Sequence, residues 1–217
     1  MRLQSFKDPL SGLSHFIGII LSIAGLILLV TKVSIGKPWH LFAFSIFGAS
    51  MILLYTASTL YHWLPLSPKG TAFLRKLDHS MIFLLIAGTY TPICLIPLRG
   101  AWGWSLFGAI WGLALFGIGY KSIWFTAPRW LSTAIYIVMG WLVIIAIWPL
   151  VHIVPWPGLA WLLTGGLFYT TGAVIYGIKK PNPWPEVFGF HEIFHLFVLM
   201  GTISHFWMVY RYFVGIR

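Results

Sequence analysis

The sequence FGFHEIFHLFVLMGTISHFWMVYRYF, residues 188–213, decides the fold class of this chain. As a helix it can cross the bilayer, since about 20 mostly apolar residues span the hydrocarbon. Two histidines, His191 and His195, lie four residues apart near its start. On a helix this spacing places both imidazoles on one face, where they can hold one metal ion together. Such a pair can also be hydrogen-bonded packing, so the other polar residues must decide.

The whole chain has the composition of a membrane protein. Of its 217 residues, 59% are hydrophobic and only 8% are charged, whereas soluble domains average about 25% charged. We therefore expect an all-α, polytopic membrane protein with a single domain of seven transmembrane helices. The seven apolar runs cover residues 9–34, 40–64, 77–97, 101–120, 130–150, 158–178 and 188–213.

The basic residues predict the orientation in the membrane. The net charge is +10, but the basic residues stand singly or in pairs at the ends of apolar runs, which is typical of membrane topology and excludes a nucleic-acid partner. Nine lie on the side of the N-terminus (Arg2, Lys7, Lys69, Arg75, Lys76, Lys121, Arg129, Lys179 and Lys180). Five lie on the other side (Lys32, Lys37, Arg99, Arg211 and Arg217). We expect a multi-pass protein of the cell (inner) membrane, with its N-terminus cytoplasmic and its C-terminus external.

Local signals predict further details. The first twelve residues lack a signal-peptide cleavage site, so we expect residue 1 to begin the mature protein. The one cysteine, Cys94, excludes an intrachain disulfide. Asp8 precedes Pro9 and is expected to cap the first helix. Gly108 and Gly112 have the GxxxG spacing of close helix packing.

Seven alternating spans bring distant polar residues to one membrane face. Odd helices begin, and even helices end, on the same side. His15 begins the first run, His62 ends the second, Asp78 begins the third, and the histidine pair begins the seventh. Ionisable groups at membrane depth usually face a bundle interior or a wet cavity. These residues are therefore expected to form one constellation.

The simplest use of this constellation is a metal held by His62, His191 and His195. Three imidazoles with a water in the fourth position are the pattern of catalytic Zn²⁺. Asp78 is the acidic residue best placed to orient that water or to act as general base. His79 is expected to point away, towards headgroups, and Glu192 to lie at the rim. His15 is expected either to donate a hydrogen bond near the site or to cap the first helix.

The motifs resemble those of a known family. Ser58 to His62 is similar to its SxxxH motif, Leu77-Asp78 to its LD motif, and His191 to His195 to its HxxxH motif. The stretch 8–15, DPLSGLSH, resembles its ExxNxxTH motif with conservative departures, and 87–92 reads AGTYTP. Over its whole length the chain resembles the bacterial hemolysin III branch of the progestin and adiponectin receptor (PAQR) superfamily.

This resemblance implies seven helices, a cytoplasmic N-terminus and one zinc near the cytoplasmic face. It implies His62, His191 and His195 as zinc ligands and Asp78 as the residue that holds the metal-activated water. Ser58, one turn from His62, would support the ligands, as would His15 and Asp8. Relatives in the wider superfamily resemble alkaline ceramidases, so the resemblance implies a zinc-dependent lipid amidohydrolase.

Several functions stay open at this point. The first is a zinc-dependent hydrolase of a membrane lipid amide or ester, with that lipid as substrate or ligand. The second is a non-enzymatic sensor or regulator of membrane state with a structural zinc, whose fourth ligand would be a protein group such as Asp78. The third is a hemolysin-like channel or transporter. A bis-histidine haem ranks last, because a pair on one helix cannot bracket a haem from both sides.

Overall fold

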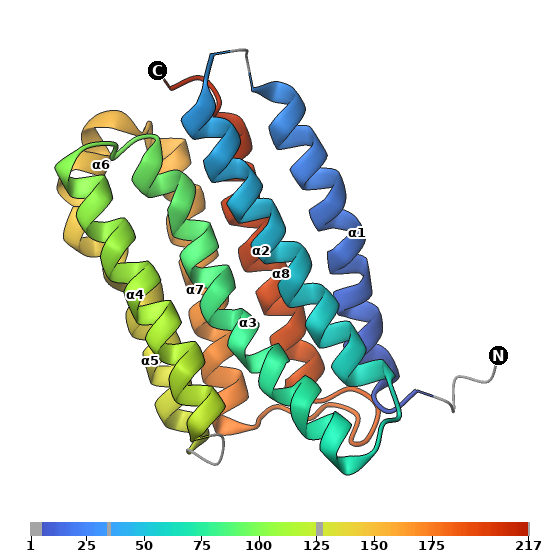
Figure 1. Ribbon diagram of the computed structural model, residues 1–217. Helices are drawn as coiled ribbons and strands as arrows, with labels where there is room; N and C mark the ends of the chain where they lie inside the picture. Colours follow the sequence, from blue (N-terminus) through green and yellow to red (C-terminus); the bar gives the residue numbers. More distant parts are fainter. Residues whose placement is uncertain (1–5, 34–35, 125–127, 217) are drawn as a thin grey trace.

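The computed structural model describes residues 6–33, 36–124 and 128–216, and these form an all-α bundle (Figure 1). Residue 34, the predicted end of the first run, and Arg2 and Arg217 of the charge count lie outside the described residues. The elements are α1 (Pro9–Lys32), α2 (Pro38–Trp63), α3 (Pro68–Leu95), α4 (Ala101–Ile123), α5 (Arg129–Trp141), η2 (Leu142–Ala146), α6 (Ile147–Ile153), α7 (Trp156–Ile178), α8 (Phe190–Met208) and η3 (Val209–Phe213).

Within the described ranges, seven helical segments are long and apolar enough to cross a membrane, as predicted. Five are the single helices α1, α2, α3, α4 and α7. The fifth span, Trp130–Ile153, joins α5, η2 and α6, and the last, Phe190–Phe213, joins α8 to the π-helical turn η3. Their outer faces carry large apolar side chains such as Phe116 and Leu115, which suit contact with lipid.

Helix α3 begins at Pro68, well before the predicted residue 77. The hydropathy pattern hides this start because the first turns are polar, but Ser67 and Pro68 are the usual pair at a helix N-terminus. The Ser67 side chain accepts the N–H of Gly70 at 3.3 Å. Asp78 therefore lies in the third turn of α3 rather than at its start.

The fifth span is broken where the sequence predicts one run. Pro149, near the start of α6, has no N–H and crowds the carbonyl one turn earlier, and the 3₁₀ segment η2 lies directly before α6. Tyr90 of α3 satisfies the backbone at this break. Its hydroxyl donates to the Gly140 carbonyl at 2.8 Å and accepts the N–H of Val143 at 2.8 Å.

Helices α2 and α3 are the most buried spans and form the centre of the bundle. Helix α2 packs against α1 and α3, α3 against α4, and α8 against α7 and α1. The start of α1 and the end of η3 lie at opposite ends of the bundle (Figure 1). The start of α1, the end of α2 and the start of α8 therefore meet at one end, as the alternating topology predicts.

Glycines show which helix faces are in close contact. A Cβ added at Gly117 would lie 2.3 Å from the Phe83 ring, so α4 approaches α3 there. The prediction of close packing at Gly108 and Gly112 is wrong, since no heavy atom lies within 4 Å of a Cβ at either. Both face outward on α4, because that helix buries a different stripe.

Candidate metal centre and its cavity

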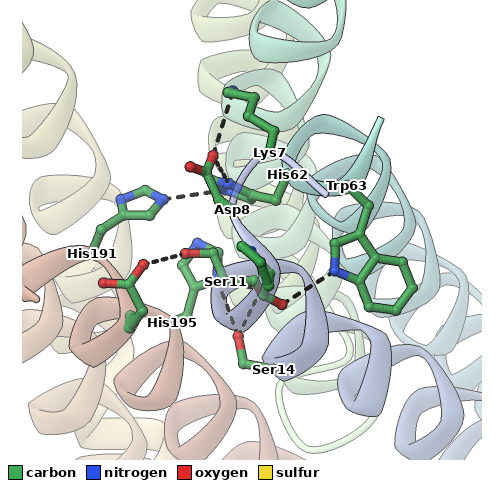
Figure 2. A network of polar contacts seen from close by, with 10 residues as sticks. Lys7, Asp8, Ser11, Ser14, His62, Trp63, His191 and His195 are labelled. Carbon is green, nitrogen blue, oxygen red and sulfur yellow. Dashed lines mark hydrogen bonds and ion pairs between the residues drawn. The ribbon is translucent and has the colours of Figure 1, made fainter. Parts of the chain in front are cut away.

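The first connection at the site joins the start of α1 to the end of α2. The N–H of Asp8 donates to the His62 carbonyl at 2.9 Å, and Asp8 Oδ2 accepts from His62 Nδ1 at 3.0 Å (Figure 2). The predicted capping role of Asp8 is wrong, because its side chain makes no cap hydrogen bond. The hydrogen bond with His62 holds the pKa of the Asp8 carboxyl below its usual range, and the Lys7 ammonium at 3.5 Å acts in the same direction.

The second connection joins α1 to α8. His195 Nδ1 lies 3.1 Å from the Ser11 carbonyl and 3.3 Å from Ser14 Oγ. A carbonyl oxygen only accepts, so the Nδ1–H of His195 donates to it. The Ser11 hydroxyl donates to Glu192 Oε1 at 2.6 Å, while Glu192 Oε2 accepts the N–H of Gly189 at 2.8 Å.

Glu192 is a residue whose role the sequence analysis missed. Its carboxylate accepts hydrogen bonds from the N–H of Gly189, before the first turn of α8, and from the Ser11 hydroxyl of α1. A glutamate three residues after the N-cap, the residue that precedes a helix, is the pattern of a capping box. That local signal could have placed its carboxylate, but the link to Ser11 depends on tertiary packing.

Three imidazoles converge at this end of the bundle (Figure 2). His191 Nε2 lies 3.2 Å from His62 Nε2. One ligand atom each from His62, His191 and His195 lies within 4.8 Å of the others, and two of the three residues are buried. The predicted ligand set is therefore assembled in one place and can hold a metal ion.

The donor set fits a metal on two further grounds. The Nδ1 atoms of His62 and His195 are engaged by the Asp8 carboxylate and the Ser11 carbonyl, which leaves each Nε2 with a lone pair. Two nitrogens at Zn–N distances of about 2.0–2.1 Å in a tetrahedron are about 3.3 Å apart. The observed 3.2 Å between His62 and His191 matches that edge.

Three other predicted site residues line a cavity beside the cluster. Asp78, Ser58 and His15 all contribute to its wall, and His15 stacks on His195 with ring centroids 3.7 Å apart. Asp78 is only 8% exposed and has Ser58 and His62 as polar neighbours. It lies outside the group of three close ligand atoms.

A second cavity, with a mostly apolar lining, lies next to the first. The two share six lining residues: Leu54, Ile82, Tyr136, Ala173, Phe194 and Val198. The far part reaches Tyr90, Trp141 and Tyr169. The histidine cluster and its cavity therefore lie beside an apolar cavity in the membrane-spanning part of the bundle.

The cavity has a further polar wall that the sequence analysis did not predict. His79 lines it together with Asp78, so the expectation that His79 points away towards headgroups is wrong. Lys121 of α4 and Ser132 and Thr133 of α5 also contribute. Nothing in their local sequence marks them, because packing of α3, α4 and α5 brings them together.

A family model and several known proteins match this chain over nearly its whole length. The family model described as "Haemolysin-III related" matches residues 3–206, which include the histidine cluster. The chain is 40% identical over 211 residues to the hemolysin-3 homolog of Bacillus subtilis (strain 168), covering 97% of this chain and 96% of that protein. It is 43% identical over 211 residues to hemolysin-3 of Bacillus cereus, covering 96% and 93%. Human monocyte to macrophage differentiation factor is 23% identical over 181 residues, covering 80% and 71%.

Proposed function

The chain belongs to the haemolysin-III family of the PAQR superfamily, and from that premise and the histidine cluster we propose a zinc-dependent hydrolase of a membrane lipid amide or ester. The observation that carries the proposal is the three-imidazole cluster beside the cavity that Asp78 lines. Both lie in a multi-pass membrane bundle, where the substrate at hand is a lipid.

The metal would be held by His62, His191 and His195. Bound zinc acts as a Lewis acid on a carbonyl oxygen and lowers the pKa of a water molecule to about 7. The protein contributes the orientation of the imidazoles: Asp8 and the Ser11 carbonyl hold two of them through their Nδ1 atoms. Zinc rather than another divalent ion is our proposal, since imidazoles suit several.

Asp78 supplies the acid–base chemistry in this proposal. Its carboxylate accepts the proton of the attacking water and later gives it to the leaving amine or alcohol. Burial beside His62 and Ser58 keeps the carboxylate away from bulk water. Ser58, one helical turn before His62, and His15, stacked on His195, shape the pocket around the reacting carbonyl.

The apolar cavity binds the acyl chain of the substrate in this proposal. An acyl chain placed there leaves its carbonyl at the polar end, near Asp78 and the cluster. Cavities of this kind, mostly apolar with a few convergent polar groups, are typical of small-molecule sites.

The position of Asp78 favours hydrolysis over a structural zinc. A structural site has four protein ligands, whereas a catalytic site keeps one position open. Asp78 lies outside the close group and faces the cavity. A sensor with a closed metal site would need a protein group such as that carboxylate as its fourth ligand.

The test begins with the metal content of detergent-purified protein. We expect about one zinc per chain in the wild type and little in His191→Ala/His195→Ala. His152→Ala is the matched control, because His152 is exposed and lies at the other end of the bundle. Well-folded wild type without metal would exclude the proposal.

Turnover is then measured on a panel of lipid amides and esters in proteoliposomes. Hydrolysis that requires zinc and fails in the double variant supports the enzyme. Full zinc content without hydrolysis of any lipid favours the sensor with a structural metal. Flux of ions or solutes through the same proteoliposomes would favour the channel or transporter.

A further inference from the structure

The loop that joins α7 to α8, residues 179–189, exposes large apolar side chains outside the membrane-spanning helices (orange in Figure 1). Trp184 is 66% exposed and Val187 is 63% exposed. Apolar side chains are unfavourable in water, and a group of them on a surface usually marks a site that binds a partner or a membrane. The loop lies at the end of the bundle that holds the histidine cluster, because it leads into the helix turn that carries His191.

Backbone hydrogen bonds give the tip of this loop a fixed shape. The N–H of Trp184 donates to the Phe188 carbonyl at 3.1 Å, and the N–H of Phe188 donates to the Trp184 carbonyl at 2.8 Å. The N–H of Val187 also donates to the Trp184 carbonyl, at 3.1 Å. A partner that binds the exposed side chains therefore loses little free energy in ordering the loop.

Asn182 bonds the loop to both of its helices. Its Oδ1 accepts the N–H of Phe190 at 3.0 Å, and its Nδ2 donates to the Lys179 carbonyl, directly after α7, at 3.1 Å. Phe190 is the first residue of α8 and precedes His191. The loop is therefore joined to the helix end that carries one of the three clustered imidazoles.

The length of α7 places the start of the loop near the lipid headgroups. The helix has 23 residues and is therefore about 34 Å long, whereas the hydrocarbon is about 30 Å thick. Its last residue, Ile178, is 63% exposed, which suits contact with lipid. Tryptophan favours the level where hydrocarbon meets headgroups, because its ring is apolar and its N–H is polar. Trp184 therefore matches the surroundings in which the loop begins.

The charge of the loop is complementary to an anionic surface. Lys179 and Lys180 are both exposed, and Glu186 is the one acidic residue between positions 179 and 189. Anionic headgroups attract lysines that lie close to the membrane surface. A lipid surface of negative charge therefore fits both the apolar and the basic side chains of the loop.

We propose that the loop 179–189 docks on the surface of a bilayer that contains anionic lipids. Trp184 and Val187 insert among the headgroups, and Lys179 and Lys180 contact the phosphates. Docking requires neither metal nor turnover, so it is separate from the proposed hydrolysis.

The test places an environment-sensitive fluorophore, NBD, on the thiol of Val187→Cys. The native Cys94 is buried and should not be labelled. The labelled protein is reconstituted in vesicles of phosphatidylcholine, alone or mixed with phosphatidylglycerol. Two quenchers are compared: iodide in the water and lipids that carry a nitroxide close to the headgroup. The adduct of the fluorophore with free cysteine in buffer is the reference for full exposure to water.

In vesicles with phosphatidylglycerol, we expect emission at shorter wavelength than the reference, quenching by the nitroxide lipid and protection from iodide. Quenching by the nitroxide lipid should be weaker without phosphatidylglycerol. Adding Lys180→Gln should remove most of this difference, because a charge of the loop is lost. The matched control is Lys69→Gln, at an exposed lysine of the same end outside the loop, and it should keep the difference. Adding Trp184→Ser should reduce the quenching in both kinds of vesicle.

The proposal is overturned if the fluorophore emits as the reference does and is quenched by iodide in vesicles with phosphatidylglycerol. That result would favour a water-soluble protein as the partner of the exposed side chains. Equal quenching by the nitroxide lipid with and without phosphatidylglycerol would exclude attraction to anionic lipids. Equal losses in Lys180→Gln and Lys69→Gln would exclude a particular contribution of the loop, and unchanged quenching in Trp184→Ser would exclude insertion of the tryptophan.

Discussion

His62 Nε2 and His191 Nε2 face each other at 3.2 Å although 129 residues separate them in the chain. The contact joins the last turn of α2 to the first turn of α8, and Asp8 holds His62 from the other side at 3.0 Å. Contacts among the start of α1, the end of α2 and the start of α8 therefore orient the imidazoles. Substitutions at these helix ends can test this arrangement.

The link between Asp8 and His62 predicts an effect on metal affinity. Asp8→Asn removes the carboxylate that accepts from Nδ1, so the ring is less basic and less firmly oriented. We expect zinc affinity to fall by about 10–100-fold, the usual effect of losing such a partner. Competition with a chromophoric chelator measures it. Glu186→Gln, at an exposed loop residue, is the matched control, and equal affinity in both variants would refute the role of Asp8.

Asp78 is expected to affect turnover without affecting the metal. Asp78→Asn keeps the shape of the side chain but cannot accept a proton, so lipid hydrolysis should fall by about 10²–10⁴-fold. Zinc content should stay near that of the wild type, because Asp78 lies outside the three close ligand atoms. A loss of zinc in Asp78→Asn would instead make it a ligand, as the structural-metal alternative requires.

Ala173 lines both cavities, and its substitution tests whether they act as one chamber. Ala173→Phe would fill the passage, so hydrolysis of long-chain lipids should fall by about 10–100-fold, as expected for a displaced substrate. Lipids with very short chains should be affected much less, and zinc content should not change. Equal losses for both lipid classes would mean that the chain does not enter the second cavity.

The sequence predicts much of this architecture, for identifiable reasons. Apolar runs show the spans directly, and alternation then brings His62 to His191 and His195. The start of α3 at Pro68 is hidden because its first turns are polar, although the Ser67-Pro68 pair marks it. It is harder to predict which of several partners a side chain bonds. The local pattern alone predicts that Asp8 caps α1, whereas in the structure its carboxylate bonds His62.

The second wall of the cavity shows where sequence reasoning fails. Lys121 looks like an ordinary basic residue at a helix end, and Ser132 like an ordinary hydroxyl early in a helix. Only the packing of α3, α4 and α5 places them in one cavity with His79. Contacts between helices that carry no motif cannot be read from periodicity.

Substitutions at two glycines of α4 are expected to change the free energy of unfolding differently. A methyl group at Gly117 would lie 2.3 Å from the buried Phe83 ring, so Gly117→Ala should destabilise the protein by about 1–3 kcal/mol. Gly112→Ala on the same helix meets no atom within 4 Å and should be neutral or stabilise the helix by up to about 1 kcal/mol. Thermal unfolding in detergent compares them. Equal stability would mean that α4 does not pack on α3 through this face.

The orientation in the membrane can be tested with single cysteines. The native thiol, Cys94, is buried and should not react, so it need not be removed. The excess of basic residues at the end of the bundle that holds Lys180 predicts that this end is cytoplasmic. In intact cells, Lys180→Cys should therefore resist a membrane-impermeant maleimide and react only after permeabilisation. Arg99→Cys, at an exposed residue of the opposite end, should react in both conditions. The reverse labelling pattern would place the histidine cluster at the external face, and the lipid supply to the cavity would then be the outer leaflet.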